Sequence, residues 1–205
     1  MGYIMDLPLF LASVVLISVP LVVSPGPVFA VTIAKGYSSK WAGVMIALGH
    51  GAIEFPLIIL LYLGLSELLN SSLVHKAIGL VGGSILLYMG LQLMRTRNSA
   101  NHEPNQIGHS SFIAGLIASA NPFFFISWAT VGAAMVENAA LFGVFGLVAF
   151  ALTHWTIDLI WASFVSITVY KSRRFWTSKV FRAVFIFCAL ILVGFGLLFI
   201  FSSLL

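Results

Sequence analysis

The chain has 205 residues, of which 60% are hydrophobic and only 8% are charged. A soluble domain carries about 25% charged residues because its surface faces water, so this composition excludes a soluble globule. The abundance of aliphatic and aromatic residues also excludes a disordered chain. We therefore predict a protein surrounded mostly by lipid. Since one membrane-spanning helix needs about 20 apolar residues, the chain has room for roughly six spans and no separate soluble domain.

The apolar segments predict an all-α, polytopic membrane protein with six transmembrane helices in a single domain, residues 1–205. A hydrophilic stretch at about 98–110 divides them into a first group within about 1–97 and a second group within about 111–205. The expected spans lie at 7–34, 41–66, 77–94, about 111–135, 139–168 and 180–201.

The basic residues predict the orientation of these spans. Nine of the ten fall after the first, third or fifth span, and Lys76 is the exception. Lysine and arginine favour cytoplasmic loops, so we expect a multi-pass protein of the cell (inner) membrane with both termini outside. Because the net charge of +4 then reflects topology, no nucleic-acid partner is predicted. The nine are Lys35, Lys40, Arg95, Arg97, Lys171, Arg173, Arg174, Lys179 and Arg182.

Self-similarity between the two groups predicts an inverted repeat. His50 and Glu54 in the second span match His154 and Asp158 in the fifth, and both pairs are offset by 104 residues. Because each group holds three spans, an odd number, the second group must enter the membrane from the opposite side. This predicts a 3 + 3 inverted repeat, an organisation common among secondary transporters.

Glu54 and Asp158 are the two acids placed well inside apolar spans. A charged side chain at the bilayer centre costs about 2.5–3.5 kcal/mol on insertion scales, so each needs a partner or a wet cavity. The histidines at 50 and 154 lie four positions earlier, on the same helix faces. Three interpretations stay open: the four groups carry protons, they coordinate a divalent cation, or they form structural hydrogen bonds between helices.

Two proline motifs predict interruptions in the helices. One is Ser24-Pro25-Gly26-Pro27 in the first span, and the other is Asn121-Pro122 in the fourth. Proline lacks an amide hydrogen and clashes with the preceding turn, so a helix breaks or kinks there. Freed backbone groups persist in a membrane only where protein or water satisfies them, and such breaks often mark binding sites. We expect both segments to contribute to a site between the halves.

These motifs resemble the LysE/RhtB family of amino-acid exporters. The resemblance rests on the segment 24–27, on Asn121-Pro122 and on glycines along the second span, and it covers essentially the whole chain. It implies a small inner-membrane antiporter that moves amino acids or similar metabolites outward, and it implies a possible homodimer. The chain departs from the family pattern at Ile53, where glycine is usual, and at Phe123, where lysine is frequent. The glycines are Gly36, Gly43 and Gly49.

We therefore predict a secondary-active, proton-coupled exporter with a site near the membrane midplane, between the two inverted halves. The alternative is a divalent-cation exporter that uses the two histidine–acid pairs. No protease motif of the membrane enzymes occurs, so an enzyme is not predicted, nor is any cofactor. The expected partners are a small-molecule substrate, protons and the lipid bilayer. The predicted substrate- or proton-binding residues are His50, Glu54, His154, Asp158, Ser24, Pro25, Gly26, Pro27, Asn121 and Pro122.

Overall fold

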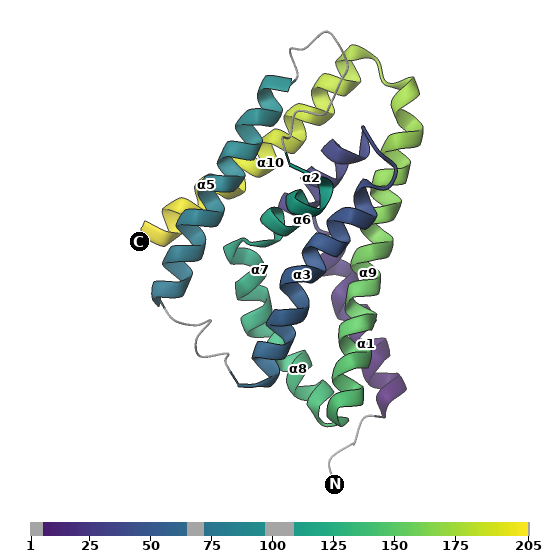
Figure 1. The fold of residues 1–205 in the computed structure, drawn as a ribbon, viewed down its shortest axis with the longest axis vertical. Coiled ribbons are helices and arrows are strands. Elements are labelled where there is room, and N and C mark those ends of the chain that lie inside the picture. Colours follow the sequence, from purple (N-terminus) through teal and green to yellow (C-terminus); the bar gives the residue numbers. More distant parts are fainter. Residues whose placement is uncertain (1–5, 65–71, 97–108, 205) are drawn as a thin grey trace.

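The computed structural model describes residues 6–64, 72–96 and 109–204, and none of these lies in a strand (Figure 1). Of the predicted hydrophilic stretch 98–110, all but the last two positions lie outside the described residues. The described elements are α1 (Leu7–Val23), α2 (Pro27–Gly36), α3 (Ala42–Tyr62), α5 (Ser72–Thr96), α6 (Ser111–Ser119), α7 (Pro122–Ser127), the π-helical η1 (Trp128–Gly132), α8 (Ala133–Ala140), α9 (Gly143–Ser172), the 3-10 helix η2 (Arg173–Phe175) and α10 (Ser178–Leu204).

Both predicted helix interruptions are confirmed. α1 ends at Val23 and α2 begins at Pro27, with the two axes bent by 67°. α6 ends at Ser119 and α7 begins at Pro122. In each case a proline occupies the first helical position, where its missing amide hydrogen costs nothing and its fixed φ favours a helix start. The prolines therefore begin a new helix rather than merely kinking an old one.

The membrane-spanning character of the fold is also confirmed. Within the part of the chain that the structure describes, four helices are long and apolar enough to cross a membrane: α3, α9, α10 and the continuous stretch Pro122–Ala140. The bent pair α1–α2 gives a fifth, and α5 contains a shorter apolar stretch, Gly79–Met94. Large apolar side chains cover the outside, as expected for surfaces that face lipid. Six spans and the inverted repeat stay predictions. The expected fourth span, about 111–135, instead runs on to Ala140, because the turn that ends it comes at Gly143, whose φ is +65°.

The centre of the molecule is built on α3, which packs against α6 and α9, while α1 packs on α9 (Figure 1). Two glycines of α3 let backbones approach closely. A Cβ added at Gly49 would collide with the carbonyl oxygen of Phe112, just inside α6, and one at Gly43 would collide with that of Ala162 in α9. Glycine is favoured at such crossings in membranes because packing and backbone contacts hold the helices together. These crossings fix His50, the neighbour of Gly49, against α6.

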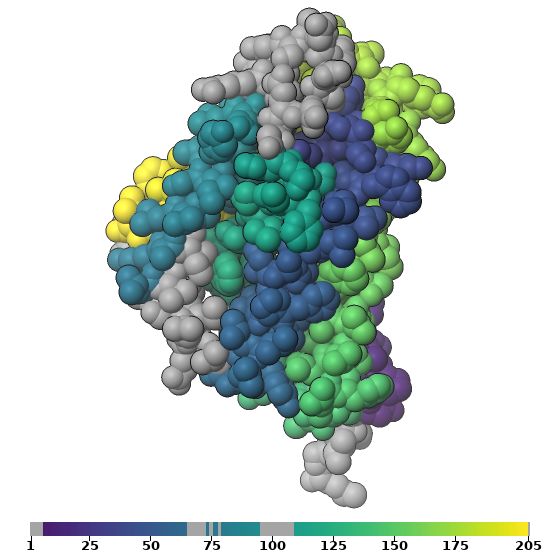
Figure 2. Space-filling view, viewed as in Figure 1, coloured from purple at the N-terminus to yellow at the C-terminus, as the bar shows by residue number. Residues whose placement is uncertain are grey.

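α5 and α10 form a separate pair along one side of the molecule (Figure 1). They meet at Gly83 and Gly196, where a Cβ on either glycine would lie 2.8 Å from the carbonyl oxygen of the other. Figure 2 shows α6 reaching the surface between α5 and α3. This pair packs on α2 and α6 and completes one of two apolar clusters in the core.

A polar layer separates the two apolar clusters. Along α3, Ile46 belongs to the first cluster and Leu57 to the second. Along α9, Val165 belongs to the first and Phe150 to the second. The histidine–acid pairs lie between these residues on both helices, so the fold places its scarce internal charges in one layer between two apolar regions.

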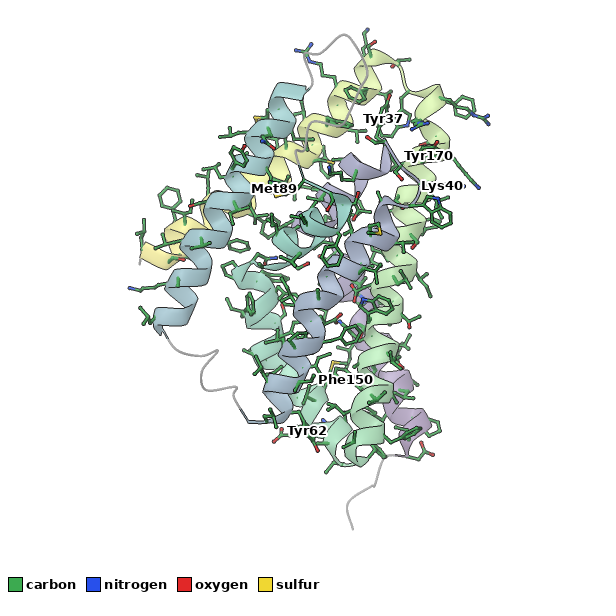
Figure 3. All side chains as sticks on the ribbon, in the orientation of Figure 1. Tyr37, Lys40, Tyr62, Met89, Phe150 and Tyr170 are labelled. Atoms are coloured by element: carbon green, nitrogen blue, oxygen red, sulfur yellow. The ribbon has the colours of Figure 1, made fainter. Side chains whose placement is uncertain are left out.

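The described residues of the connections predicted to be cytoplasmic meet at one end of the molecule. Figure 3 places Lys40 and Tyr170 at this end and Tyr62 at the opposite end. Arg173 donates to the carbonyl of Tyr37 at 2.7 Å, which ties the turn after α2 to the end of α9. Lys35 donates to the carbonyl of His109. The basic residues described there share one end, as a positive-inside topology requires; which side of the membrane that end faces stays a prediction.

Candidate functional site

A cavity of about 200 Å³ lies in the centre of the fold, and its wall includes most of the predicted site residues. His50, His154 and Asp158 line it, and so do residues of the two helix breaks. Two predicted residues do not reach the wall: Glu54 is 0% exposed and Pro122 is buried beside its neighbour Asn121. The predicted members on the wall are Ser24, Pro25, Gly26, Pro27, His50, Asn121, His154 and Asp158.

The two histidine–acid pairs converge on each other. His154 Nε2 lies 3.1 Å from Glu54 Oε1, a carboxylate oxygen from the other pair, and 3.7 Å from Asp158 Oδ2. His50 Nε2 lies 3.9 Å from Glu54 Oε2 and 3.9 Å from Asp158 Oδ1. Both imidazoles therefore face both carboxylates, and the four side chains form one cluster rather than two separate pairs.

Two serines hold the outer nitrogens of these histidines. Ser18 Oγ in α1 lies 2.7 Å from His154 Nδ1, and Ser119 Oγ in α6 lies 2.6 Å from His50 Nδ1. Both serines are 0% exposed. Sequence reasoning missed them because serine is common in membrane helices. One signal was available: the two are offset by 101 residues, close to the offset of 104 that relates the histidine–acid pairs.

The hydrogen bonds of Ser119 determine which nitrogen of neutral His50 carries the proton. The Ser119 hydroxyl donates its one hydrogen to the carbonyl of Gly115 at 2.7 Å. It can then only accept from His50 Nδ1, so Nδ1 carries the hydrogen and Nε2 is unprotonated in the neutral ring. An unprotonated Nε2 facing two carboxyl groups is a proton acceptor, so this side of the cluster can take up a proton.

The opposite side has a different hydrogen-bond pattern. Among the described contacts, the Ser18 hydroxyl has no carbonyl acceptor and is available to donate to His154 Nδ1. The hydrogen of neutral His154 then lies on Nε2, where it faces Glu54 Oε1 at 3.1 Å. His154 is therefore arranged to share a proton with Glu54 even while its ring is uncharged.

Aromatic side chains enclose both imidazoles. The Phe124 ring meets the His50 ring at 5.2 Å between centroids and 76°, and the Trp128 ring meets His154 at 5.3 Å and 82°. Such edge-to-face contacts are favourable and fix the orientation of both rings. Both aromatic residues also line the cavity. They cover part of each histidine ring, and the cavity is the route by which a solute reaches the cluster.

The two helix breaks present different groups to the cavity. Asn121 caps α7 with its own side chain: Oδ1 accepts from the amide of Phe124, and Nδ2 donates to the carbonyl of Ala118. Its amide is therefore occupied by backbone. The N-cap of α2, Gly26, has no side chain to cap the first turn. A Cβ there would lie 4.0 Å from the carbonyl oxygen of Ser24, its nearest neighbour, and Gly26 lines the cavity, so the first turn of α2 has backbone amides without a side-chain cap beside the cavity.

The cluster also has the composition of a cation site. His50, Glu54 and Asp158 can each offer one ligand atom, and these atoms all lie within 4.8 Å of one another. One imidazole and two carboxylates suit several divalent metals. The same atoms equally suit proton exchange, so geometry alone does not separate the two interpretations.

Broken helices around a cavity between apolar clusters define the class of protein: an all-helical membrane transporter for small solutes. The family model for the LysE type translocator matches residues 19–203, and the chain belongs to this family. The resemblance inferred from the two proline motifs is thereby confirmed.

A Bacillus subtilis (strain 168) protein is similar over nearly the whole chain. It is named "Putative amino acid efflux protein YcgF" and is 25% identical over 198 residues, which cover 93% of this chain and 94% of that protein. No solved structure matches the chain.

Proposed function

We propose that the protein exports amino acids or similar small metabolites in exchange for protons, and that the central cavity is its substrate site. One observation carries this proposal: a single cavity brings together the broken segment before α2, the break before α7 and the histidine–acid cluster. In transporters, broken helices and buried ionisable groups mark the pathway of substrate and coupling ion. Membership of a translocator family and the name of the Bacillus relative support export of amino acids.

The size and chemistry of the cavity support a small zwitterionic substrate. Pockets for drug-sized ligands occupy roughly 300–1,000 Å³, and this one is about 200 Å³. Asp158 can accept from an ammonium group, while the uncapped amides and positive dipole end of α2 favour a carboxylate. Most of the remaining wall is apolar. These features match an amino acid better than a sugar, which needs many polar partners.

Exchange with protons follows from competition at the carboxylates. With Asp158 ionised, the cavity attracts the ammonium group of a substrate from the cytoplasm. Once the cavity opens outward, a proton arriving through His50 neutralises Asp158, and the substrate ammonium loses its partner. The proton then leaves on the cytoplasmic side, where the proton concentration is lower. Alternating access comes from one half of the chain rocking against the other.

The membrane placement belongs to the same proposal. We place the end that holds Lys40 and Arg173 in the cytoplasm, both termini outside and the cavity near the midplane of the inner membrane. Matched contacts support the inverted 3 + 3 repeat, in which α1, α2, α3 and α5 correspond to α6, α7–α8, α9 and α10. α3 packs on α6 as α9 packs on α1. A homodimer, as the family resemblance implies, completes the proposal.

Efflux from proteoliposomes tests this function. Purified protein is reconstituted, loaded with each of the twenty amino acids in turn, and assayed with and without an imposed pH gradient. We expect efflux of at least one amino acid, accelerated by an inward proton gradient and lost in Asp158→Asn. Glu137→Gln is the matched control, because Glu137 is an exposed acid on α8. An efflux rate that does not change with the pH gradient would refute proton coupling. The absence of efflux for every amino acid would refute the proposed substrate class.

The same vesicles test the alternative function, export of a divalent cation. The cluster of His50, Glu54 and Asp158 supplies the possible ligands for such a cation. Loading with Zn²⁺, Mn²⁺ or Cd²⁺ and a fluorescent indicator reports any export of metal. Family membership alone does not select a metal, whereas the named relative favours amino acids. We expect no metal efflux above that of empty vesicles. Metal efflux without amino-acid efflux would establish the alternative.

A further inference from the structure

Two buried polar atoms in the cavity wall have no hydrogen-bond partner among the described residues. They are Nε1 of Trp161, a donor, and Oδ2 of Asp158, an acceptor. Both residues line the cavity. A buried polar group without a partner is costly, so orphaned groups in a native structure call for a missing partner. Glu54, whose carboxylate oxygens face the two imidazoles, is not part of the cavity wall.

The two orphaned groups are held next to each other. Trp161 and Asp158 lie three positions apart on α9, which places their side chains side by side on one helix face, with about 5–6 Å between Cβ atoms. The indole is stacked on Phe29 of α2, at 6.4 Å and 13°, and on Phe164, at 5.7 Å and 25°. Oδ1 of Asp158 lies 3.9 Å from His50 Nε2, and Oδ2 lies 3.7 Å from His154 Nε2, which is beyond hydrogen-bond distance. The fold therefore fixes one donor and one acceptor beside the same cavity.

We propose that Trp161 and Asp158 form a clamp for the two ends of a free α-amino acid. The indole N–H donates to the substrate carboxylate, and the Asp158 carboxylate accepts from the substrate ammonium. An α-amino acid carries these two groups on one carbon, which suits a donor and an acceptor one helical turn apart. This inference rests on the proposed function and adds a binding residue and a requirement for a free carboxylate.

The rest of the wall selects the side chain of the substrate. Among the described lining residues, no lysine or arginine occurs, and Asp158 is the one acid. The clamp occupies that acid, so a second positive charge on the substrate finds no partner. Apolar residues of the wall include Val28, Phe195 and Phe29, on which the indole is stacked. The site therefore takes amino acids whose side chains carry no positive charge and are preferentially apolar.

Binding to the purified full-length protein tests the clamp. The probes are leucine, methionine and threonine, each paired with its methyl ester, which keeps the ammonium group but loses the carboxylate charge. A hydrogen bond to a charged group is worth about 10- to 100-fold in affinity. In Trp161→Phe we expect binding of the amino acid to weaken by about this factor, and binding of the ester to change by less than about twofold. Lysine should bind more weakly than leucine in the wild type.

Affinity measurements keep this test independent of yield, because a dissociation constant does not depend on the fraction of protein that is folded. Trp41→Phe is the control, since Trp41 is 62% exposed at the start of α3. Equal weakening of acid and ester in Trp161→Phe, or no weakening of either, overturns the clamp while leaving the exporter intact. If the wild type binds none of the three amino acids or esters, the substrate proposal fails as well.

Discussion

The two halves of the polar cluster share a plan but differ in where the hydrogen lies. On each side a serine holds the outer nitrogen of a histidine, and the inner nitrogen faces the carboxylates. Ser119 donates to a carbonyl of its own helix, which forces the hydrogen of neutral His50 onto Nδ1. Ser18 has no such acceptor among the described contacts, so His154 can present a hydrogen to Glu54. Similar residues at matched positions can thus be a proton acceptor on one side and a proton donor on the other.

The comparison also shows how the two sides depend on each other. Ser18 is 136 positions from His154, whereas Ser119 is 69 positions from His50. Each histidine is therefore held by a helix from the other group of spans. Neither half of the chain completes its own part of the cluster, so the difference between the two sides is a property of the assembled fold.

The largest effect is expected for Glu54→Gln, which removes the group that both sides share. Proton-driven efflux should fall by at least about 100-fold, the scale of a lost proton-transfer group. A neutral amide keeps the size of the side chain but cannot hold the shared proton. Efflux from proteoliposomes under an imposed pH gradient measures the change. Wild-type efflux in this variant would show that the cluster is structural.

Ser119→Ala should have the next largest effect, and it should exceed that of Ser18→Ala. Loss of the Ser119 hydroxyl frees His50 to move its hydrogen to Nε2, which destroys the proton acceptor. The bond from His50 Nδ1 to Ser119 favours the Nδ1-protonated tautomer by about 1–3 kcal/mol, so its loss should change the ratio of the two tautomers by roughly 5- to 100-fold. ¹⁵N NMR of labelled histidine distinguishes the two tautomers directly. An Nε2-protonated His50 in the wild type would contradict the assignment.

Gly49→Ala should disturb one side of the cluster and spare the other. The added methyl group would collide with the carbonyl of Phe112 and lie 2.9 Å from the amide of Leu116, which pushes α6 away from α3. Ser119 is carried by α6, so its bond to His50 should lengthen while the Ser18–His154 bond persists. We expect about 1–3 kcal/mol lower stability, the cost of overpacking, measured by thermal unfolding in detergent.

Gly194→Ala is the control for this variant, because a Cβ there meets nothing within 4 Å. Alanine also favours a helix over glycine by about 1 kcal/mol. The melting temperature of the control should therefore stay level or rise. A comparable fall in both variants would mean that the crossing of α3 and α6 is not the cause.

The smallest effects are expected from the aromatic contacts, and they should be similar on the two sides. Phe124→Leu and Trp128→Leu each remove an edge-to-face contact with a histidine, worth about 0.5–1.5 kcal/mol. Efflux should fall only a few-fold in either variant, measured in the same vesicles. If efflux in only one of these variants fell as far as in Glu54→Gln, the two aromatic contacts would not be equivalent, and the prediction of similar effects would be wrong.

The sequence was sufficient for those parts of the site that depend on rare residues. Internal acids and helix-breaking proline motifs are uncommon in apolar helices. Glu54, Asp158 and the breaks before Pro27 and Pro122 could therefore be found without a structure. Physical costs make such residues conspicuous: each one disturbs either the charge or the backbone of a membrane helix.

Ser18, Ser119 and Trp161 did not stand out in any local pattern because their types are ordinary in membrane helices. Their roles come from contacts between distant segments, which no local pattern encodes. Likewise, the 67° bend between α1 and α2 depends on the neighbours that α2 packs against. The burial of Glu54 behind the histidines, rather than on the cavity wall, arises from the same packing.

The burial of Glu54 separates the solute in the cavity from one of the two carboxylates of the cluster. A solute in the cavity can touch Asp158 directly, but it cannot reach Glu54, whose side chain is 0% exposed and closed off by imidazole rings. Potassium, amines and other cations that enter the cavity therefore compete for one carboxylate and leave the other alone. Cargo and proton therefore compete at Asp158 alone, while Glu54 exchanges protons only with the histidines.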